Sequence, residues 1–318
     1  MSDLERRPLL SARAATLGIE GARGPAELTF ETTGDRLFVA GLGGPLFSAL
    51  MSLPEGMTQA SNLASMGELC EVAGPWRVVA GSLDIAGHPV GSHLAAVGAA
   101  PLDPPHPPRG TVGEYLDARL ALKLALRGER ASAAERQTRI EETVSRAGLS
   151  GGRGRALKTL SFVERRVLEI ASAMVARPEV VVLEQPLANL DGQGAEYVRG
   201  AIEAAAHVGR LIVSGGSLAP GSPEGALARS SSDFLLLSPT GMVAFGPPGE
   251  VLAGARTFRV EARTRGAELR ARLEAAGAKT TGGDARFTVA MPEGGDATGI
   301  LRTAHEVQSA VVVVLPLL

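Results

Sequence analysis

The stretch that decides the fold is "VVVLEQPLANLD", from Val180 to Asp191. Four consecutive aliphatic residues indicate a β-strand that is buried on both faces, as in a parallel sheet covered by helices. Glu184, Gln185 and Pro186 end this run. A carboxylate at such a strand end can hold a metal ion, but an amide such as that of Gln185 cannot accept a proton from water. The strand therefore has the layout of a catalytic strand from which one of the reacting groups is missing.

The composition restricts the classes of protein that the chain can represent. It has 318 residues, with 32 Lys+Arg against 34 Asp+Glu, so the formal net charge of −2 gives no overall field that attracts nucleic acid. A single cysteine, Cys70, excludes an internal disulfide and a cysteine-clustered metal site. No metal motif fits the spacing of the histidines, which are His88, His93, His106, His207 and His305.

Neither end of the chain carries a targeting or membrane-spanning signal. The N-terminus has charges of both signs and lacks an apolar run of signal-peptide length. The aliphatic run Ala310 to Leu318 is far shorter than the roughly 18 residues that a bilayer span needs. We therefore expect a soluble chain in a reducing compartment.

The first 255 residues predict alternating strands and helices, and hence a mostly parallel sheet covered by helices. A strand at Leu37–Gly41 is followed by a glycine loop and a helix, which is the layout of a phosphate-binding unit. After the proline-rich loop Pro101–Gly110, Thr111 is a predicted N-cap with Glu114 as its capping-box partner. Later segments predict helices in "AERQTRIEETVSRAGL", "SFVERRVLEIASAMVA" and "YVRGAIEAAAHV", a strand in "RLIVSGG" and a hairpin in "SDFLLLSPTGMVAFG".

The pattern changes near Arg256. The last 60 or so residues predict a β-α-β-α-β order, which is typical of a small separate α+β module. We therefore divide the chain into an N-terminal domain of residues 1–255, with a helical part at about 111–175, and a C-terminal domain of residues 256–318.

This order of elements resembles the nucleotide-binding subunit of ABC transporters, in particular exporter subunits with a short C-terminal α+β domain. The resemblance covers about Leu10 to Leu252, and its strongest anchor is the ungapped stretch "LSFVERRVLEIASAMVARPEVVVLEQPLANLD". There the spacing is that of the family's signature helix, magnesium strand and D-loop. The resemblance implies a P-loop NTPase-like ABC ATPase core with a helical subdomain.

The position of the phosphate loop departs from the family pattern. The family's G-x-x-x-x-G-K-[ST] uses glycine amides, a lysine and a hydroxyl to hold the triphosphate and magnesium. The stretch "GLGGPLFS" keeps Gly41, Gly43, Gly44 and Ser48, but Leu46 and Phe47 stand where the family has Gly and Lys. We expect a collapsed loop that packs on apolar side chains, although a reading in which some nucleotide still binds stays open.

Other positions depart from the pattern in the same way. At the magnesium strand the family has Asp followed by Glu, where this chain has Glu184 followed by Gln185. The Glu184 side chain is long enough to reach a metal. Gln185 reads as a polar group at the strand end. In the signature loop, Ser161 is kept, as a γ-phosphate contact or only an N-cap, but Phe162 and Val163 replace the two glycines. The family also has a glutamine that senses magnesium and the permease, and its position corresponds to Leu102 here. The family's switch histidine, which follows a late strand, corresponds to Gly215 or Gly216. Asp191 is kept in the D-loop, for dimer assembly or as a helix cap.

These departures predict a degenerate subunit, a pseudo-ATPase that keeps the fold without hydrolysis, needs no cofactor and works as a structural or regulatory part of a transporter. The resemblance implies docking of an integral membrane permease near Pro101, Leu102 and Tyr115, pairing with an intact ATPase or a second copy, and a cytoplasmic, membrane-peripheral location. Two alternatives stay open: a divergent but active ATPase that uses ATP and magnesium to energise export, and a soluble regulator that has left the membrane.

Overall fold

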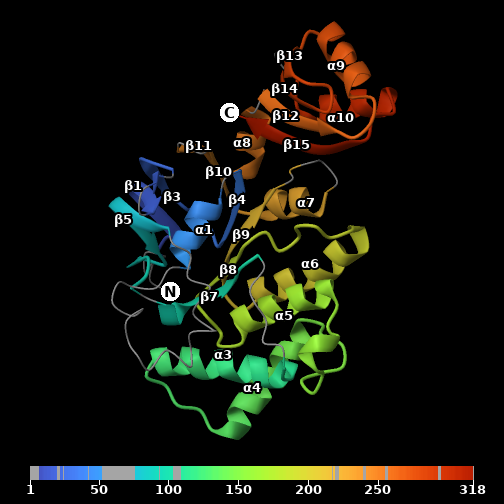
Figure 1. The fold of residues 1–318 in the computed structure, drawn as a ribbon. Coiled ribbons are helices and arrows are strands. Elements are labelled where there is room, and N and C mark those ends of the chain that lie inside the picture. Colours follow the sequence, from blue (N-terminus) through green and yellow to red (C-terminus); the bar gives the residue numbers. More distant parts are fainter. Residues whose placement is uncertain are drawn as a thin grey trace, which may run out of the picture.

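A six-stranded sheet forms the centre of the N-terminal region in the computed structural model (Figure 1). The structure describes residues 7–19, 22–23, 25–41, 43–51, 76–92, 94–102, 109–216, 218, 222–238, 241–254, 257–292 and 295–317. Within these ranges the strand order is β11-β10-β4-β9-β8-β7. Its members are β4 (Arg36–Gly41), β7 (Val97–Ala100), β8 (Val180–Leu183), β9 (Arg210–Gly215), β10 (Asp233–Leu237) and β11 (Met242–Gly246). Every neighbouring pair is parallel except β10 with β11, so the expected covered parallel sheet and the hairpin are confirmed; Pro239 and Thr240 of its turn lie outside the described residues.

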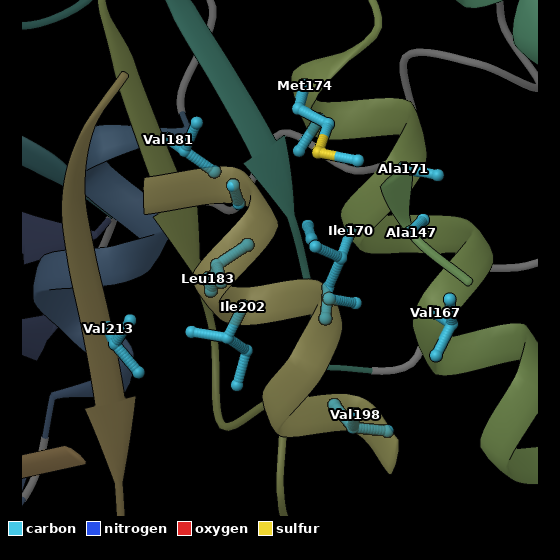
Figure 2. Packing of buried hydrophobic residues seen from close by; sticks show 14 of the residues in the cluster. Ala147, Val167, Ile170, Ala171, Met174, Val181, Leu183, Val198, Ile202 and Val213 are labelled. Atoms are coloured by element: carbon cyan, nitrogen blue, oxygen red, sulfur yellow. The ribbon is translucent and has the colours of Figure 1, made fainter. Parts of the chain in front are cut away.

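Strand β8 is buried on both faces. All four of its residues have no exposed surface. Val181 and Leu183 pack into a cluster with α5 (Phe162–Met174) and α6 (Gly192–Ala206), as Figure 2 shows. Val180 and Val182 point to the other face and join a second cluster, which includes α1 (Gly44–Leu50). The strand thus holds the two halves of the core together.

The second face of the central sheet is covered by an antiparallel sheet. Its strands are β1 (Leu10–Ile19), β2 (Ala22–Arg23), β3 (Leu28–Glu31), β5 (Arg77–Ile85) and β6 (His88–Pro89). The sequence segment Trp76–Gly87, which contains β5, has strand composition with glycine breaks, but the sequence patterns do not predict the other strands. Strand β1 mixes Ser, Arg, Thr and four Ala or Gly residues among few large aliphatics, and its register shifts where it pairs with β3 and β5. Such a strand lacks the clean alternation that identifies a half-buried strand from sequence.

The helical part lies below the core in Figure 1 and consists mainly of α3 (Val112–Leu126) and α4 (Ala133–Arg146). The predicted capping box at the start of α3 is confirmed, because the Thr111 hydroxyl accepts a hydrogen bond from the Glu114 amide and the Glu114 carboxylate accepts one from the Thr111 amide. The remaining short elements are the 3₁₀ turns η3 (Leu94–Ala96) and η4 (Leu157–Thr159), and the helices α7 (Pro223–Ser230) and α8 (Pro248–Gly254).

The C-terminal module has its own antiparallel sheet and its own apolar cluster, at the opposite end of the molecule from α3 and α4 in Figure 1. The sheet order β13-β14-β12-β15 contains one strand more than predicted, so the order is β-α-β-β-α-β. The missed strand, "KTTG", is mostly exposed and ends in glycine, so it gives no hydrophobic signal. The elements are β12 (Thr257–Ala262), α9 (Gly266–Ala275), β13 (Lys279–Gly282), β14 (Arg286–Ala290), α10 (Ala297–Glu306) and β15 (Val311–Leu317).

Within the described residues, no helix combines the length and the apolar character that crossing a membrane requires.

The two-sided burial of β8 makes its interior intolerant of charge. We expect Val182→Asp to abolish folding, because an unpaired buried carboxylate costs several kcal/mol against a total stability of about 5–15 kcal/mol. Val79→Asp is the matched control, since Val79 is also in a strand but is 58 % exposed. Thermal unfolding followed by circular dichroism measures both variants. A Val182→Asp protein that melts cooperatively near the wild-type temperature would contradict this role of β8.

Candidate functional site

The strand ends that carry the predicted site positions lie side by side at one edge of the central sheet. Gly41 at the end of β4 pairs with Leu237 of β10, and Ala40 pairs with Gly215 of β9. On the other side, Leu183 of β8 pairs with Val213 of β9. The ends of β4, β8 and β9 therefore meet where ligands bind in open α/β sheets.

At the position of the phosphate loop, apolar side chains fill the space below the loop. Gly41 has a φ of +80°, and a Cβ at this position would lie 2.1 Å from the carbonyl oxygen of Leu237, so only glycine fits here. Leu46 and Phe47 have no exposed surface and belong to the cluster of Val39, Val180 and Val182. The Ser48 hydroxyl accepts a hydrogen bond from the Trp76 amide at 3.2 Å. These contacts agree with the expected apolar packing of this loop.

The end of β8 is held by hydrogen bonds to the neighbouring strand ends. The Glu184 carboxylate accepts a hydrogen bond from the Leu102 amide at 3.2 Å, which joins the residue in the metal position to the residue in the sensor position. The backbone N–H of Gln185 donates a hydrogen bond to the Ser214 hydroxyl of β9 at 2.9 Å. Gln185 also has a φ of +42°, in the left-handed region that side-chain-bearing residues seldom adopt. The contact of Gln185 with the neighbouring strand is thus made by its backbone.

The end of β9 leaves room for a larger side chain. At Gly215 a Cβ would lie 2.5 Å from the Phe38 ring, so this residue must stay small. Gly216 is exposed, and no atom lies within 4 Å of a Cβ built there. Among the described residues, packing therefore leaves room for a Cβ at Gly216 but not at Gly215.

The signature-like residues start helix α5. The Ser161 hydroxyl accepts a hydrogen bond from the Glu164 amide at 3.3 Å, and the Glu164 carboxylate accepts one from the Ser161 amide at 2.8 Å. Phe162 is 47 % exposed, and its ring is stacked by the Arg166 guanidinium at 5.2 Å. Val163 packs toward α6. Its Cγ2 is so close to Gly194 of that helix that a Cβ added at Gly194 would lie 3.1 Å from it. The N-terminus of α5 is therefore capped by its own side chains.

Glu164 and Arg155 are functional candidates that the sequence analysis missed. The Arg155 guanidinium forms a bidentate ion pair with the Glu164 carboxylate, with an Nη2 to Oε2 distance of 2.9 Å. This guanidinium lowers the pKa of Glu164 to about 2. The Ser161-x-x-Glu164 spacing is a capping-box signal in the sequence, but no local pattern indicates the pairing with Arg155.

Asp191 starts helix α6. Its carboxylate accepts a hydrogen bond from the Gly194 amide at 2.7 Å, which is the N-cap arrangement. The folded chain thus uses Asp191 as a helix cap. This hydrogen bond uses Oδ1, so the second carboxylate oxygen is not needed for the cap.

The predicted docking residues divide into two kinds. Pro101 and Leu102 follow the end of β7 and are half-buried, whereas Tyr115 is only 5 % exposed. The Tyr115 hydroxyl donates to Glu169 at 2.8 Å and accepts from Arg119 at 2.9 Å, and burial raises the pKa of Tyr115. Tyr115 is a core residue of the helical part, which corrects the expectation that its side chain offers a surface for docking. The prolines between Pro101 and Gly110 lie largely outside the described residues.

Metal-binding clusters are absent from the described ranges: no group of three or more His, Cys, Asp or Glu residues there could hold an ion. A metal at this edge would have Glu184 as its protein carboxylate, one oxygen of which, Oε2, accepts the hydrogen bond from the Leu102 amide.

Similar proteins were found by sequence and by structure, although no family model matches the chain. An ABC transporter ATP-binding protein of Pyrococcus furiosus is 30 % identical over 105 residues, which are 33 % of this chain and 37 % of the relative. The cobalt import ATP-binding protein CbiO of Rhodobacter capsulatus is 32 % identical over 128 residues, 40 % of this chain and 44 % of the relative. The matched part thus spans less than half of the length of these relatives.

The fold agrees with the sequence relatives. The structure of cbiO1 from Clostridium perfringens, part of the ABC transporter complex cbiONQ, superposes with a TM-score of 0.58 at 15 % identity over 78 % of this chain and 92 % of that one. A bacterial Atm1-family ABC exporter with ATP bound gives a TM-score of 0.53 at 17 % identity, over 77 % of this chain and 40 % of that one. Over part of its length, the chain is thus similar in sequence to ABC transporter ATP-binding proteins. The chain has the P-loop NTPase-like fold of ABC ATPases.

The Arg155–Glu164 pair gives this ABC-type fold a measurable acid response. Because the folded-state pKa of Glu164 is lowered, its ionised form stabilises the fold above the unfolded-state pKa of about 4.3, and this contribution is lost as the pH falls toward 2. We expect Glu164→Gln to lower the free energy of unfolding at neutral pH, with the difference from wild type shrinking between about pH 4.5 and pH 2.

Chemical denaturation at several pH values measures this difference. Glu135→Gln is the matched control, because Glu135 closes a similar capping box with Ser132 at the start of α4 but is exposed; its pKa is lowered first by the hydrogen bonds from Ser132 and least by the charge of Arg139, so it reports the pH response of the capping box without a bidentate arginine. A Glu164→Gln difference that is independent of pH would rule out this role of the ionised carboxylate.

Proposed function

We propose that the chain is an ABC ATP-binding-subunit homologue that does not hydrolyse ATP and that acts as a structural or regulatory subunit of a membrane ABC transporter complex. The observation that carries the proposal is the position of Phe47. In the resemblance this residue stands where the family has the phosphate-binding lysine, and its ring is fully buried in an apolar cluster. A triphosphate needs cationic and amide donors at this place, and a buried aromatic ring supplies neither.

Three further observations support the proposal. The carboxylate of Glu184 accepts a hydrogen bond within the chain, and Gln185 cannot act as a general base, whose removal typically costs about 10²–10⁴ in rate. The N-terminus of α5 is occupied by the carboxylate of Glu164, which accepts the Ser161 amide and pairs with Arg155, so this helix end is already capped within the chain.

The partners follow from the same resemblance. We propose that an integral membrane permease binds near Pro101 and Leu102, and that an intact ATPase subunit or a second copy of the chain completes the complex on the cytoplasmic face of the membrane. Relatives by sequence or structure include a cobalt import protein and an exporter, so the exporter type rests on the resemblance of the C-terminal module alone. A divergent but active ATPase, using ATP and magnesium, is the competing function.

Nucleotide binding separates the two functions directly. We expect isothermal titration calorimetry with ATP and magnesium to show no binding in the micromolar range, because Phe47 replaces the cation that the phosphates need. We also expect Gln185→Glu to leave the chain without ATPase activity, since restoring the base restores neither the phosphate loop nor the signature glycines. A one-to-one isotherm in the micromolar range, or ATPase activity in the Gln185→Glu variant, would favour the competing function.

Pairing provides a second test, which uses the complex with an intact ATPase subunit. In the ABC family each nucleotide lies between the phosphate loop of one subunit and the signature loop of the other. Because Phe162 and Val163 replace the signature glycines, we expect hydrolysis by the complex to be insensitive to Ser161→Arg.

Ser132→Arg is the matched control, because Ser132 caps α4 with the same capping-box hydrogen bonds away from the signature-like loop. Activity lost in the Ser161→Arg complex but kept in the Ser132→Arg complex, with assembly intact in both, would show that this chain completes a working site.

A further inference from the structure

The geometry points to Arg155 as a positioning residue that couples the start of α3 to the start of α5. Its backbone and its side chain bind the N-termini of two different helices. One of these helices follows the proposed docking loop, and the other carries the signature-like residues. The coupling itself is a property of the isolated chain, and only its use in a transporter rests on the proposed function.

The first connection is made by backbone hydrogen bonds to the start of α3. The carbonyl oxygen of Arg155 accepts a hydrogen bond from the Val112 amide at 2.9 Å, and that of Arg153 accepts one from the Gly113 amide at 2.8 Å. In the opposite direction, the Leu157 amide donates to the Gly110 carbonyl at 3.0 Å. The segment before α5 therefore binds two of the amides at the start of α3 that have no partner within their own helix.

The second connection is made by the Arg155 guanidinium at the start of α5. Both of its terminal nitrogens bind the Glu164 carboxylate, and this carboxylate accepts the Ser161 amide at 2.8 Å. The same guanidinium donates to the carbonyl oxygens of Ser150 at 3.3 Å and Thr159 at 3.0 Å. A planar guanidinium fixes the direction as well as the distance of such bonds, so it orients the cap of α5 relative to the loop.

The surroundings favour the transmission of a displacement along this path. Leu157 and Leu160, which flank the path, are 3 % and 4 % exposed and belong to the main apolar cluster. The Arg155 and Glu164 side chains are 24 % and 16 % exposed, so solvent screens their pairing less than that of surface pairs. Arg153 provides a contrast, because its pairing with Glu141 at 3.1 Å lies between side chains about half exposed. A contact that moves the start of α3 would thus also move the carboxylate that caps α5.

Amide hydrogen exchange on the chain alone, measured by NMR, tests the coupling. We expect Arg155→Ala to speed the exchange of the Ser161 and Glu164 amides, and also that of the Val112 and Gly113 amides, by about tenfold or more, because charge-assisted hydrogen bonds in the path are lost. Arg155→Lys should show a smaller effect at both helices, since an ammonium keeps the charge without the planar fork. Arg153→Ala, which removes an exposed ion pair from the same loop, should change neither.

The reverse direction is tested from the α3 end. A Cβ at Gly113 would lie 3.1 Å from the Arg153 carbonyl oxygen, so Gly113→Ala should displace the loop slightly. Because coupling is reciprocal, we expect faster exchange of the Ser161 and Glu164 amides in this variant.

Some outcomes would overturn the inference. In folded Arg155→Ala, unchanged exchange at Val112 and Gly113 would show that the two helices are independent. Equal acceleration of all amides, including those of α9 and α10, in both Arg155 variants would show general destabilisation in place of coupling. If Arg155→Ala does not fold, the other two variants decide. Unchanged amide exchange at the start of α3 in Arg155→Lys, together with unchanged exchange at the start of α5 in Gly113→Ala, would refute the inference. No membrane partner or nucleotide enters these measurements, so failure of the proposed function leaves their outcome unaffected.

Discussion

The two-sided burial of β8 is the constraint on which the rest of the N-terminal region depends. A strand with four fully buried aliphatic residues must have a layer of apolar side chains on each face. Helices α5 and α6 provide the layer around Val181 and Leu183, and α1 with the antiparallel sheet provides the layer around Val180 and Val182. Each of these side chains contributes on the order of 1.5–3 kcal/mol through burial, so the layers cannot be removed without loss of the fold.

Sequence patterns predicted the elements whose signal is local. The aliphatic run of β8, the amphipathic helices and the Thr111–Glu114 capping box each depend on residues within a few positions of one another. Apart from β5, the antiparallel sheet was missed, because β1 contains few large apolar residues and pairs across register shifts. The C-terminal strand "KTTG" was missed because it is short and mostly exposed.

The residues of the candidate site also differ in whether a local sequence signal identifies them. The assignments of Phe47, Gln185 and Phe162 rest on spacing alone, because each lies at a fixed offset within a short family motif. The burial of Tyr115 depends on Glu169 and Arg119, and the closure of the α5 cap depends on Arg155, nine residues before its partner in a glycine-rich loop. Interactions of this kind are fixed by how distant turns fold onto one another, and no periodicity reports them.

Under the proposed function, the separation between strand interiors and strand ends explains how the fold can persist without the chemistry. Substitutions at Glu184, Gln185 or Gly216 alter groups at the sheet edge and leave the two apolar layers in place. At the position that the resemblance gives to the phosphate loop, Leu46 and Phe47 are part of the layer that covers β8. Returning a lysine to position 47 would place an ammonium group among apolar side chains, where its charged form is disfavoured and its pKa falls. Under the proposed function, a phosphate site at this place would therefore require repacking of this layer as well as polar residues, because the apolar side chains that are present stabilise the fold.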